Sequence, residues 1–122
     1  MPPRYAILHH DQIDSPHFDL LFETSPNSPL LAWRSQAWPI SRSTPLLHLP
    51  DHRGHYLSYE GPLSAGRGTV RRVESGSVID LALTPAQIRM TLQNDSGTIV
   101  LKLALDPFRG EPHWMAEPAT GA

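Results

Sequence analysis

Two short segments of this chain gather side chains that can bind metals and transfer protons. The first runs from His9 to Asp19 and the second from Asp51 to Gly61. Together they contain five of the seven histidines, with carboxylates and phenols close by. Imidazole is a common ligand of zinc, manganese and iron, and a carboxylate shifts the preference towards harder ions. This mixture is typical of a metal site that supports hydrolysis.

The first segment predicts three metal ligands on one face of a two-stranded hairpin. An apolar run leads into His9 and His10, and a second strand begins at His17. Because side chains alternate across a strand, His17 and Asp19 point to one face, and pairing places either His9 or His10 beside them. Two histidines and one aspartate form an open site with room for water or substrate. The spacing is equally compatible with two surface histidines and a turn aspartate.

Three blocks of sequence carry a resemblance to a known enzyme family. His10-Asp11 and then His17–Glu23 correspond to a strand ending in His-Asp, followed by His-aromatic-Asp-Phe-x-Leu-Glu. Leu30–Pro39 occupies the place of a Leu-x-x-Trp-x-x-Pro stretch. Asp51–Gly61 matches Asp-His-x-x-x-Tyr-x-x-aromatic-Glu-Gly without gaps. On these residues the chain resembles the 3'-phosphoesterase domain of bacterial DNA ligase D, and more closely its small stand-alone relatives, from about residue 5 to residue 105.

The resemblance implies one divalent metal ion, with manganese favoured and zinc or another transition metal as alternatives. Its ligands would be His10, His17 and Asp19. The interval between the first histidine and His17 is one residue longer than in the family, so His9 is an alternative to His10. Such an ion binds a phosphate oxygen and lowers the pKa of a water molecule. We therefore expect a metal-dependent phosphoesterase.

Phosphate recognition is expected from the second segment and from arginines. By resemblance, His52 stabilises charge on the phosphate or donates a proton to the leaving oxygen, and Tyr56 hydrogen-bonds the same phosphate. Arg53 and Arg67 are candidate phosphate ligands. They could compensate for basic residues of the ligase domains that are replaced here by aliphatic or hydroxyl side chains, at Leu21, Ile40 and Thr44.

The implied substrate is a 3'-terminal ribonucleotide or a 3'-phosphate at a DNA end, which would make DNA repair proteins natural partners. The missing basic residues leave a second hypothesis, a metal-binding or nucleic-acid-end-binding module with reduced catalysis. A third hypothesis is a metallohydrolase that acts on a small phosphoester. The formal net charge of −2 disfavours tight binding to long duplexes but allows a few local contacts at a strand end.

Composition excludes several other classes of protein. The chain contains no cysteine, which excludes a disulfide framework, a thiolate metal site and a cysteine nucleophile. No run has the length of a transmembrane helix, and no signal peptide opens the sequence. We therefore expect a cytoplasmic protein that does not act on membranes.

The elements that must position these residues are predicted to be mainly strands. The 13 prolines and 8 glycines separate short apolar or alternating runs. These runs and the resemblance predict an all-β fold, a small closed or nearly closed β-barrel of about eight strands with one or two short helical turns. Thr84–Gln87 is a candidate for such a turn. The runs are Tyr5–His9, Phe18–Glu23, Leu31–Gln36, Leu46–Leu49, Gly68–Val73, Ser77–Ala82, Gln87–Gln93 and Thr98–Leu105.

We expect one barrel domain over residues 1–105, with the site in its crevice. Residues 106–122 are rich in Pro, Gly, Glu and Ala and lack a clear apolar period, which predicts a loose C-terminal tail.

Overall fold

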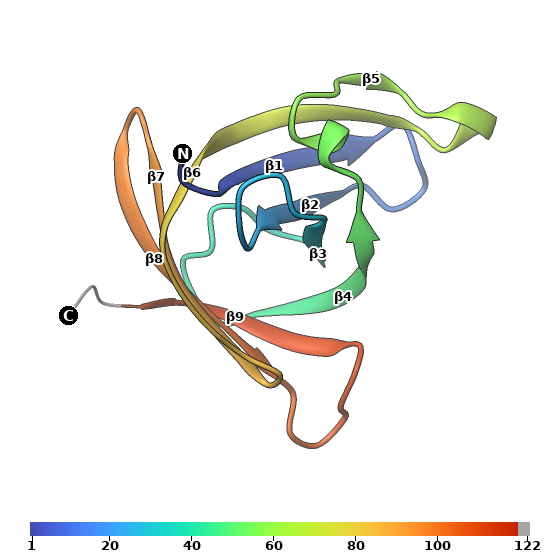
Figure 1. Cartoon of the computed structure of the whole chain (residues 1–122). Coiled ribbons are helices and arrows are strands. Elements are labelled where there is room, and N and C mark those ends of the chain that lie inside the picture. The colour runs from blue at the N-terminus through green and yellow to red at the C-terminus, as the bar shows by residue number, and fades with distance from the viewer. Residues whose placement is uncertain (120–122) are drawn as a thin grey trace.

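The computed structural model describes residues 1–119 as an all-β protein built around a closed antiparallel barrel. The wall strands follow the order β1-β2-β3-β4-β9-β8-β7-β6, and β6 pairs with β1 to close the ring (Figure 1). The predicted fold class is therefore confirmed. The strands are β1 (Arg4–Asp11), β2 (His17–Glu23), β3 (Leu30–Ser35), β4 (Thr44–His52), β5 (Gly61–Pro62), β6 (Thr69–Thr84), β7 (Gln87–Asn94), β8 (Gly97–Leu105) and β9 (His113–Ala119), and the 3-10 turns are η1 (Gly54–Leu57) and η2 (Ser64–Gly66).

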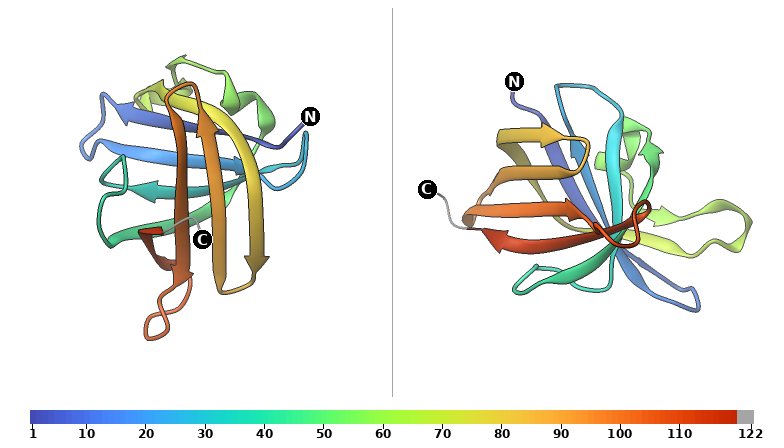
Figure 2. Two further views of the ribbon diagram at one scale, coloured as in Figure 1. Left: turned by 90° about the vertical axis from the view of Figure 1, so that its left-hand side faces the viewer. Right: turned by 90° about the horizontal axis from the view of Figure 1, so that it is seen from below.

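Strand β6 is long because it takes part in both halves of the barrel. Its first residues pair with β1, and its last residues pair with β7. Strands β6–β9 cross β1–β4 at a steep angle (Figure 2). At the point where β6 changes partner, a Cβ on Gly76 would lie 2.0 Å from the carbonyl oxygen of Gln93 and 2.9 Å from the ring of Tyr5. Only glycine therefore allows this close approach of three strands.

The barrel interior is filled by one hydrophobic cluster with members from all eight wall strands. Its largest fully buried side chains are Trp33, Tyr5 and Phe22. On β1 and β2 the inward positions alternate with outward ones, as a pleated strand requires. Ile7 and Leu20, for example, are direct cross-strand partners that both belong to this interior cluster.

A second hydrophobic cluster lies on the opposite, outer face of β1–β3. It includes Ala6, Leu8 and Leu21, which alternate along the strands with the interior residues. Leu57 of η1 and Val70 of β6 pack on these residues from outside. The connection between β4 and β6, drawn in green in Figure 1, therefore covers this outer face and creates a sheltered layer next to the wall.

The predicted boundary at residue 105 is wrong. Strand β9 lies between β4 and β8, and Trp114 and Ala116 are 3% and 0% exposed. The barrel therefore extends to at least Ala119, and the proline- and glycine-containing segment after Leu105 is a turn rather than a domain boundary. The last part of the predicted tail, residues 120–122, lies outside the described residues.

The helical turn predicted at Thr84–Gln87 is also not formed. This segment is the tight connection between β6 and β7, and Thr84 Oγ1 accepts a hydrogen bond of 3.0 Å from the Gln87 N–H. The two short helical turns η1 and η2 lie instead in the connection that covers the outer face. Within residues 1–119, no helix has both the length and the apolar character needed to cross a lipid bilayer.

Candidate metal centre

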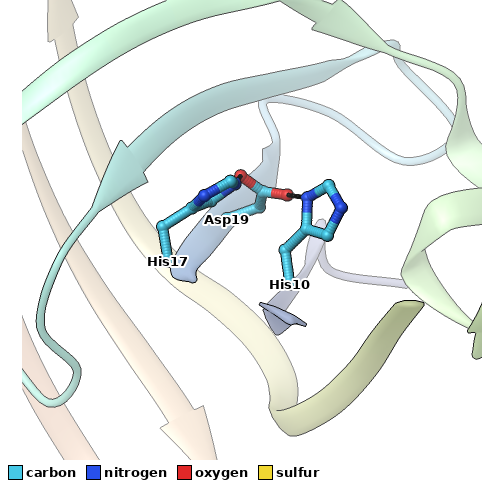
Figure 3. A group of neighbouring side chains, drawn as sticks. All are labelled: His10, His17 and Asp19. Atoms are coloured by element: carbon cyan, nitrogen blue, oxygen red, sulfur yellow. Dashed lines mark ion pairs between the residues drawn. The ribbon is translucent and has the colours of Figure 1, made fainter. Parts of the chain in front are cut away.

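His10, His17 and Asp19 converge on the outer face of the β1–β2 hairpin (Figure 3). His10 is the direct cross-strand partner of His17, and Asp19 stands opposite Leu8, one pleat further along. One ring nitrogen of each histidine and one carboxylate oxygen lie within 4.8 Å of one another. The structure thus brings together the three residues that alternation and the family resemblance singled out.

His9 is not part of this cluster. Neighbouring residues on a strand face opposite sides, so His9 points away from His10. Its ring packs on Phe18 with a centroid distance of 4.9 Å, and its Nδ1 lies 3.5 Å from an oxygen of Asp11. The alternative assignment of His9 as the first ligand therefore has no geometric support.

Both cluster histidines are oriented by backbone carbonyl groups. His17 Nδ1–H donates to the carbonyl oxygen of Ser15 at 3.0 Å, and His10 Nε2–H donates to that of Arg67. In the neutral form of each ring, the other nitrogen carries a lone pair. His17 Nε2 lies 3.3 Å from one oxygen of Asp19, and His10 Nδ1 lies 3.9 Å from the other. A carbonyl partner that fixes the tautomer is typical of metal-ligating histidines.

The arrangement fits a bound cation because two of its acceptors face each other without a donor. His17 Nε2 and Asp19 Oδ1 are buried, and neither has a hydrogen-bond partner among residues 1–119. Two unpaired buried acceptors are unfavourable. A divalent ion with bonds of about 2.1 Å places tetrahedral ligand atoms about 3.4 Å apart, which is close to the observed 3.3 Å. The three residues therefore suit a divalent metal.

The protonation of His17 also suits a ligand. Burial lowers the pKa of His17, and the charges of Arg34 and His10 act in the same direction, against the raising effects of the Ser15 carbonyl and Asp19. The imidazole is therefore neutral at pH 7, and its Nε2 lone pair is available for coordination.

A cavity of about 310 Å³ opens beside the cluster. Its polar wall includes His10 and Asp19 from the hairpin, Arg34 from β3, His52 from the end of β4, and Tyr56 and Arg67 from the covering connection. The rest of its wall is mainly apolar and is formed by Leu8, Leu49, Pro50, Leu63 and Val70. The cavity thus joins the candidate metal ligands to the residues predicted to contact phosphate.

His52 and Tyr56 are placed by the end of β4 and the first 3-10 turn. His52 Nδ1–H donates to the carbonyl oxygen of Pro50 at 2.9 Å, which leaves its Nε2 available. The Tyr56 ring meets the His52 ring edge-on with centroids 5.6 Å apart, and it also packs on His55 at 4.1 Å. Both predicted catalytic residues therefore line the same cavity as the cluster.

The predicted phosphate-binding arginines are placed differently from one another. Arg67 lines the cavity, but its guanidinium donates to the carbonyl oxygen and the hydroxyl of Ser64 at 3.0 and 2.8 Å. Arg53 precedes η1, is exposed and does not line the cavity, so the prediction for Arg53 has no support in this geometry.

The positions that carry basic residues in the ligase domains supply no cation to the cavity. Leu21 is fully buried in the outer cluster beneath it, and Ile40 is buried in the barrel interior. Thr44 is also buried, and its hydroxyl donates to the carbonyl oxygen of Arg42 at 2.8 Å.

One cavity residue, Arg34, was not identified from the sequence. It lies on β3 directly opposite Asp19 and lines the cavity. The only local signal for Arg34 is that it follows the large apolar residue Trp33. Because neighbouring residues on a strand face opposite sides, Arg34 faces outward when Trp33 faces the interior. The β2–β3 register was also needed to place it beside Asp19.

Comparison with known proteins does not assign the chain to a family, because no protein-family model and no curated protein matches its sequence.

Proposed function

We propose that this chain is a metal-dependent phosphoesterase that acts on 3'-terminal ribonucleotides or 3'-phosphates at nucleic-acid ends. The observation that carries the proposal is the pair of buried, unpartnered acceptors on His17 and Asp19, which converge with His10 beside a cavity. A divalent ion held there would polarise a phosphoryl oxygen and lower the pKa of a bound water. Manganese is the first candidate, from the resemblance to the ligase D domain, and zinc is the second.

The protein supplies two groups on the other side of the same cavity. His52 is fixed by its bond to the Pro50 carbonyl, and in the imidazolium form it would present an Nε2–H that stabilises charge on the phosphate or is donated to the leaving oxygen. Tyr56 offers a phenol that hydrogen-bonds the phosphate. These roles follow the resemblance, and the shared cavity supports them.

The size of the cavity favours the end of a strand over a duplex. Its volume of about 310 Å³ is at the lower end of the range of small-molecule pockets, roughly 300–1,000 Å³. One terminal nucleotide can enter such a space, whereas a base-paired helix cannot. The net charge of −2 agrees with a substrate held by few local contacts.

A second candidate function is a metal-binding or nucleic-acid-end-binding module with reduced catalysis. The observation that favours it is the burial of Leu21 and Ile40, because neither position can contribute the cation that the ligase domains have there. A third candidate, hydrolysis of small phosphoesters, shares the same site chemistry.

The decisive experiment measures hydrolysis with three substrates in the presence and absence of manganese. The substrates are a primer-template with a 3'-terminal ribonucleotide, one with a 3'-phosphate, and a free nucleoside 3'-monophosphate. His52→Ala should keep the metal and lose about a hundredfold or more of the rate. Asp19→Asn should lose both the metal and the activity.

Each result selects one function. Manganese-dependent release from primer ends, with slower turnover of the mononucleotide, supports the end-processing phosphoesterase. Equal or faster turnover of the mononucleotide selects the small-phosphoester hydrolase. Bound metal without turnover of any substrate selects the binding module and overturns the proposal.

A further inference from the structure

We infer that Arg34 is a phosphate-binding residue of this cavity, with its guanidinium directed at the non-bridging oxygens of the bound phosphate. The identification of that phosphate as an ester at a strand end rests on the proposed function. The affinity of Arg34 for a phosphate oxyanion does not depend on the proposed function.

The first argument is position. Asp19 and Arg34 are direct partners in the β2–β3 register, so both side chains leave the sheet on the same outer face. Arg34 lines the cavity together with His10, Asp19 and His52. A phosphate held between the metal cluster and His52 would therefore meet Arg34 as well.

The second argument is the absence of a counter-charge. Although Asp19 is the cross-strand neighbour of Arg34, no carboxylate oxygen among residues 1–119 lies within 4.0 Å of the Arg34 nitrogens. Its Nε is buried and has no hydrogen-bond partner in the same part of the chain. A buried guanidinium N–H without an acceptor is unfavourable, and an anion in the cavity would satisfy it.

The third argument is that the other cations near the site are already occupied or lie elsewhere. The guanidinium of Arg67 is engaged by Ser64, and Arg53 does not line the cavity. Among residues 1–119, Arg34 is thus the cavity arginine whose guanidinium has no acceptor, and its planar set of N–H groups matches two oxygens of a phosphate.

Arg34 also borders a second cavity, which it shares with Arg109, Gln36 and Asp106. This provides a matched control. Arg109 is exposed, and its backbone N–H is bonded to Asp106, so Arg109→Met removes a charge from the second cavity without touching the metal cluster. Arg34→Met removes the charge shared by both cavities and keeps an apolar stem of similar length.

The test measures the dissociation constant for inorganic phosphate by calorimetry, with and without manganese, in wild type, Arg34→Met, Arg34→Lys and Arg109→Met. We expect Arg34→Met to weaken binding roughly 10- to 100-fold in both conditions, with a smaller loss for Arg34→Lys because lysine lacks the fork. Arg109→Met should bind as wild type does. Equal affinity in Arg34→Met and wild type would overturn the inference.

A second readout does not depend on how the variants fold. In nitrogen-15-labelled wild type, the Arg34 Nε–H resonance should shift on titration with phosphate and again with a nucleoside 3'-monophosphate. A resonance that stays in place at saturating phosphate overturns the inference. A response to phosphate but not to the nucleotide supports an anion site that is separate from ester binding.

The outcomes separate this inference from the proposed function. If no substrate is hydrolysed but phosphate affinity still depends on Arg34, the proposed function fails and the inference stands. If wild type hydrolyses primer ends and Arg34→Met does so with unchanged KM and kcat, the inference fails and the proposed function stands.

Discussion

His10 and His17 are direct cross-strand partners, and their rings lie 4.8 Å apart in an edge-on arrangement. Each ring is fixed from a different loop. The β1–β2 turn supplies the Ser15 carbonyl for His17, and the connection that covers the outer face supplies the Arg67 carbonyl for His10. The orientation of His10 therefore depends on the packing of that connection on the hairpin, which links the candidate metal site to the outer hydrophobic cluster.

The first prediction separates the two adjacent histidines. His10→Ala should weaken manganese binding by more than the 10- to 100-fold typical of losing an outer-sphere partner, because it removes a direct ligand. His9→Ala should leave the affinity unchanged, because His9 faces Phe18 on the other side of the strand. Titration with manganese followed by electron paramagnetic resonance measures the dissociation constant of each variant and the stoichiometry, which we expect to be about one ion per chain. A larger loss in His9→Ala would reverse the assignment.

The second prediction concerns a glycine that supports His10. Gly68 has φ +87°, and an added Cβ would lie 2.4 Å from the Asp11 carbonyl oxygen and 3.0 Å from His10 Nε2. Gly68→Ala should therefore displace the His10 ring and weaken manganese binding by at least about tenfold.

The control for this change is Gly66→Ala. Gly66 also has a positive φ, +68°, but nothing lies within 4 Å of the added Cβ. The Gly66→Ala substitution should cost about 1–2 kcal/mol of folding free energy, because alanine disfavours the left-handed backbone conformation at this position. It should leave the metal affinity unchanged. Equal metal affinities in the two variants would show that Gly68 does not support the site.

The parts of the site that are local in sequence could be predicted, and the parts that depend on register could not. Alternation places His17 and Asp19 on one face of a strand, and the hairpin brings His10 to them. Arg34 comes from the next strand, and only the pairing Asp19↔Arg34 shows that it belongs to the same cavity. The family resemblance places the site in a crevice of the barrel. The two hydrophobic clusters show that it lies on the outer face of the wall.

The fold class could be predicted because many short apolar runs separated by breakers are typical of barrels. Strand β9 was missed because its inward side chains, Trp114 and Ala116, make a short pattern that ends at Pro118. One of its partners, β4, is more than sixty residues away, since Leu46 pairs with Trp114. Such long-range pairing leaves little local signal in the sequence.

The third prediction concerns the pH dependence of stability at Glu23. This carboxylate is 1% exposed and accepts hydrogen bonds from the Arg4 N–H and the Asn27 N–H, both at 2.8 Å, and from the Arg4 side chain. Burial alone would raise the pKa of Glu23, but these hydrogen bonds outweigh it and lower the pKa below its usual value. The unfolded chain therefore binds the proton more tightly than the native state does.

The stabilisation from Glu23 should consequently be complete above the unfolded pKa of about 4.3 and be lost as the pH falls through the lower native value. Glu23→Gln should cost about 1–3 kcal/mol of unfolding free energy at pH 7, and the difference from wild type should shrink below about pH 4. Urea denaturation at several pH values measures this. Glu117→Gln, whose half-exposed carboxylate pairs with Lys102 at 3.7 Å and accepts a hydrogen bond of 3.2 Å from the Ser43 hydroxyl, should cost less than about 1 kcal/mol. A difference for Glu23→Gln that persists in acid would contradict the assignment.

The last prediction concerns the C-terminal strand. Trp114 packs against Trp33 with a centroid distance of 5.6 Å, and its Nε1–H donates to Glu111 at 2.9 Å. Trp114→Ala should therefore cost about 3–5 kcal/mol, as is usual for a large aromatic residue removed from a core. Phe108→Ala is the control, because Phe108 is 96% exposed and should change stability by no more than about 0.5 kcal/mol.

Deletion of residues 106–122 should lower the stability further than Trp114→Ala does, since it leaves the facing edges of β4 and β8 unpaired and opens the barrel. Thermal unfolding followed by circular dichroism, with sedimentation to detect aggregation, measures all three. A truncated chain that does not aggregate and melts as the full chain does would show that β9 is dispensable.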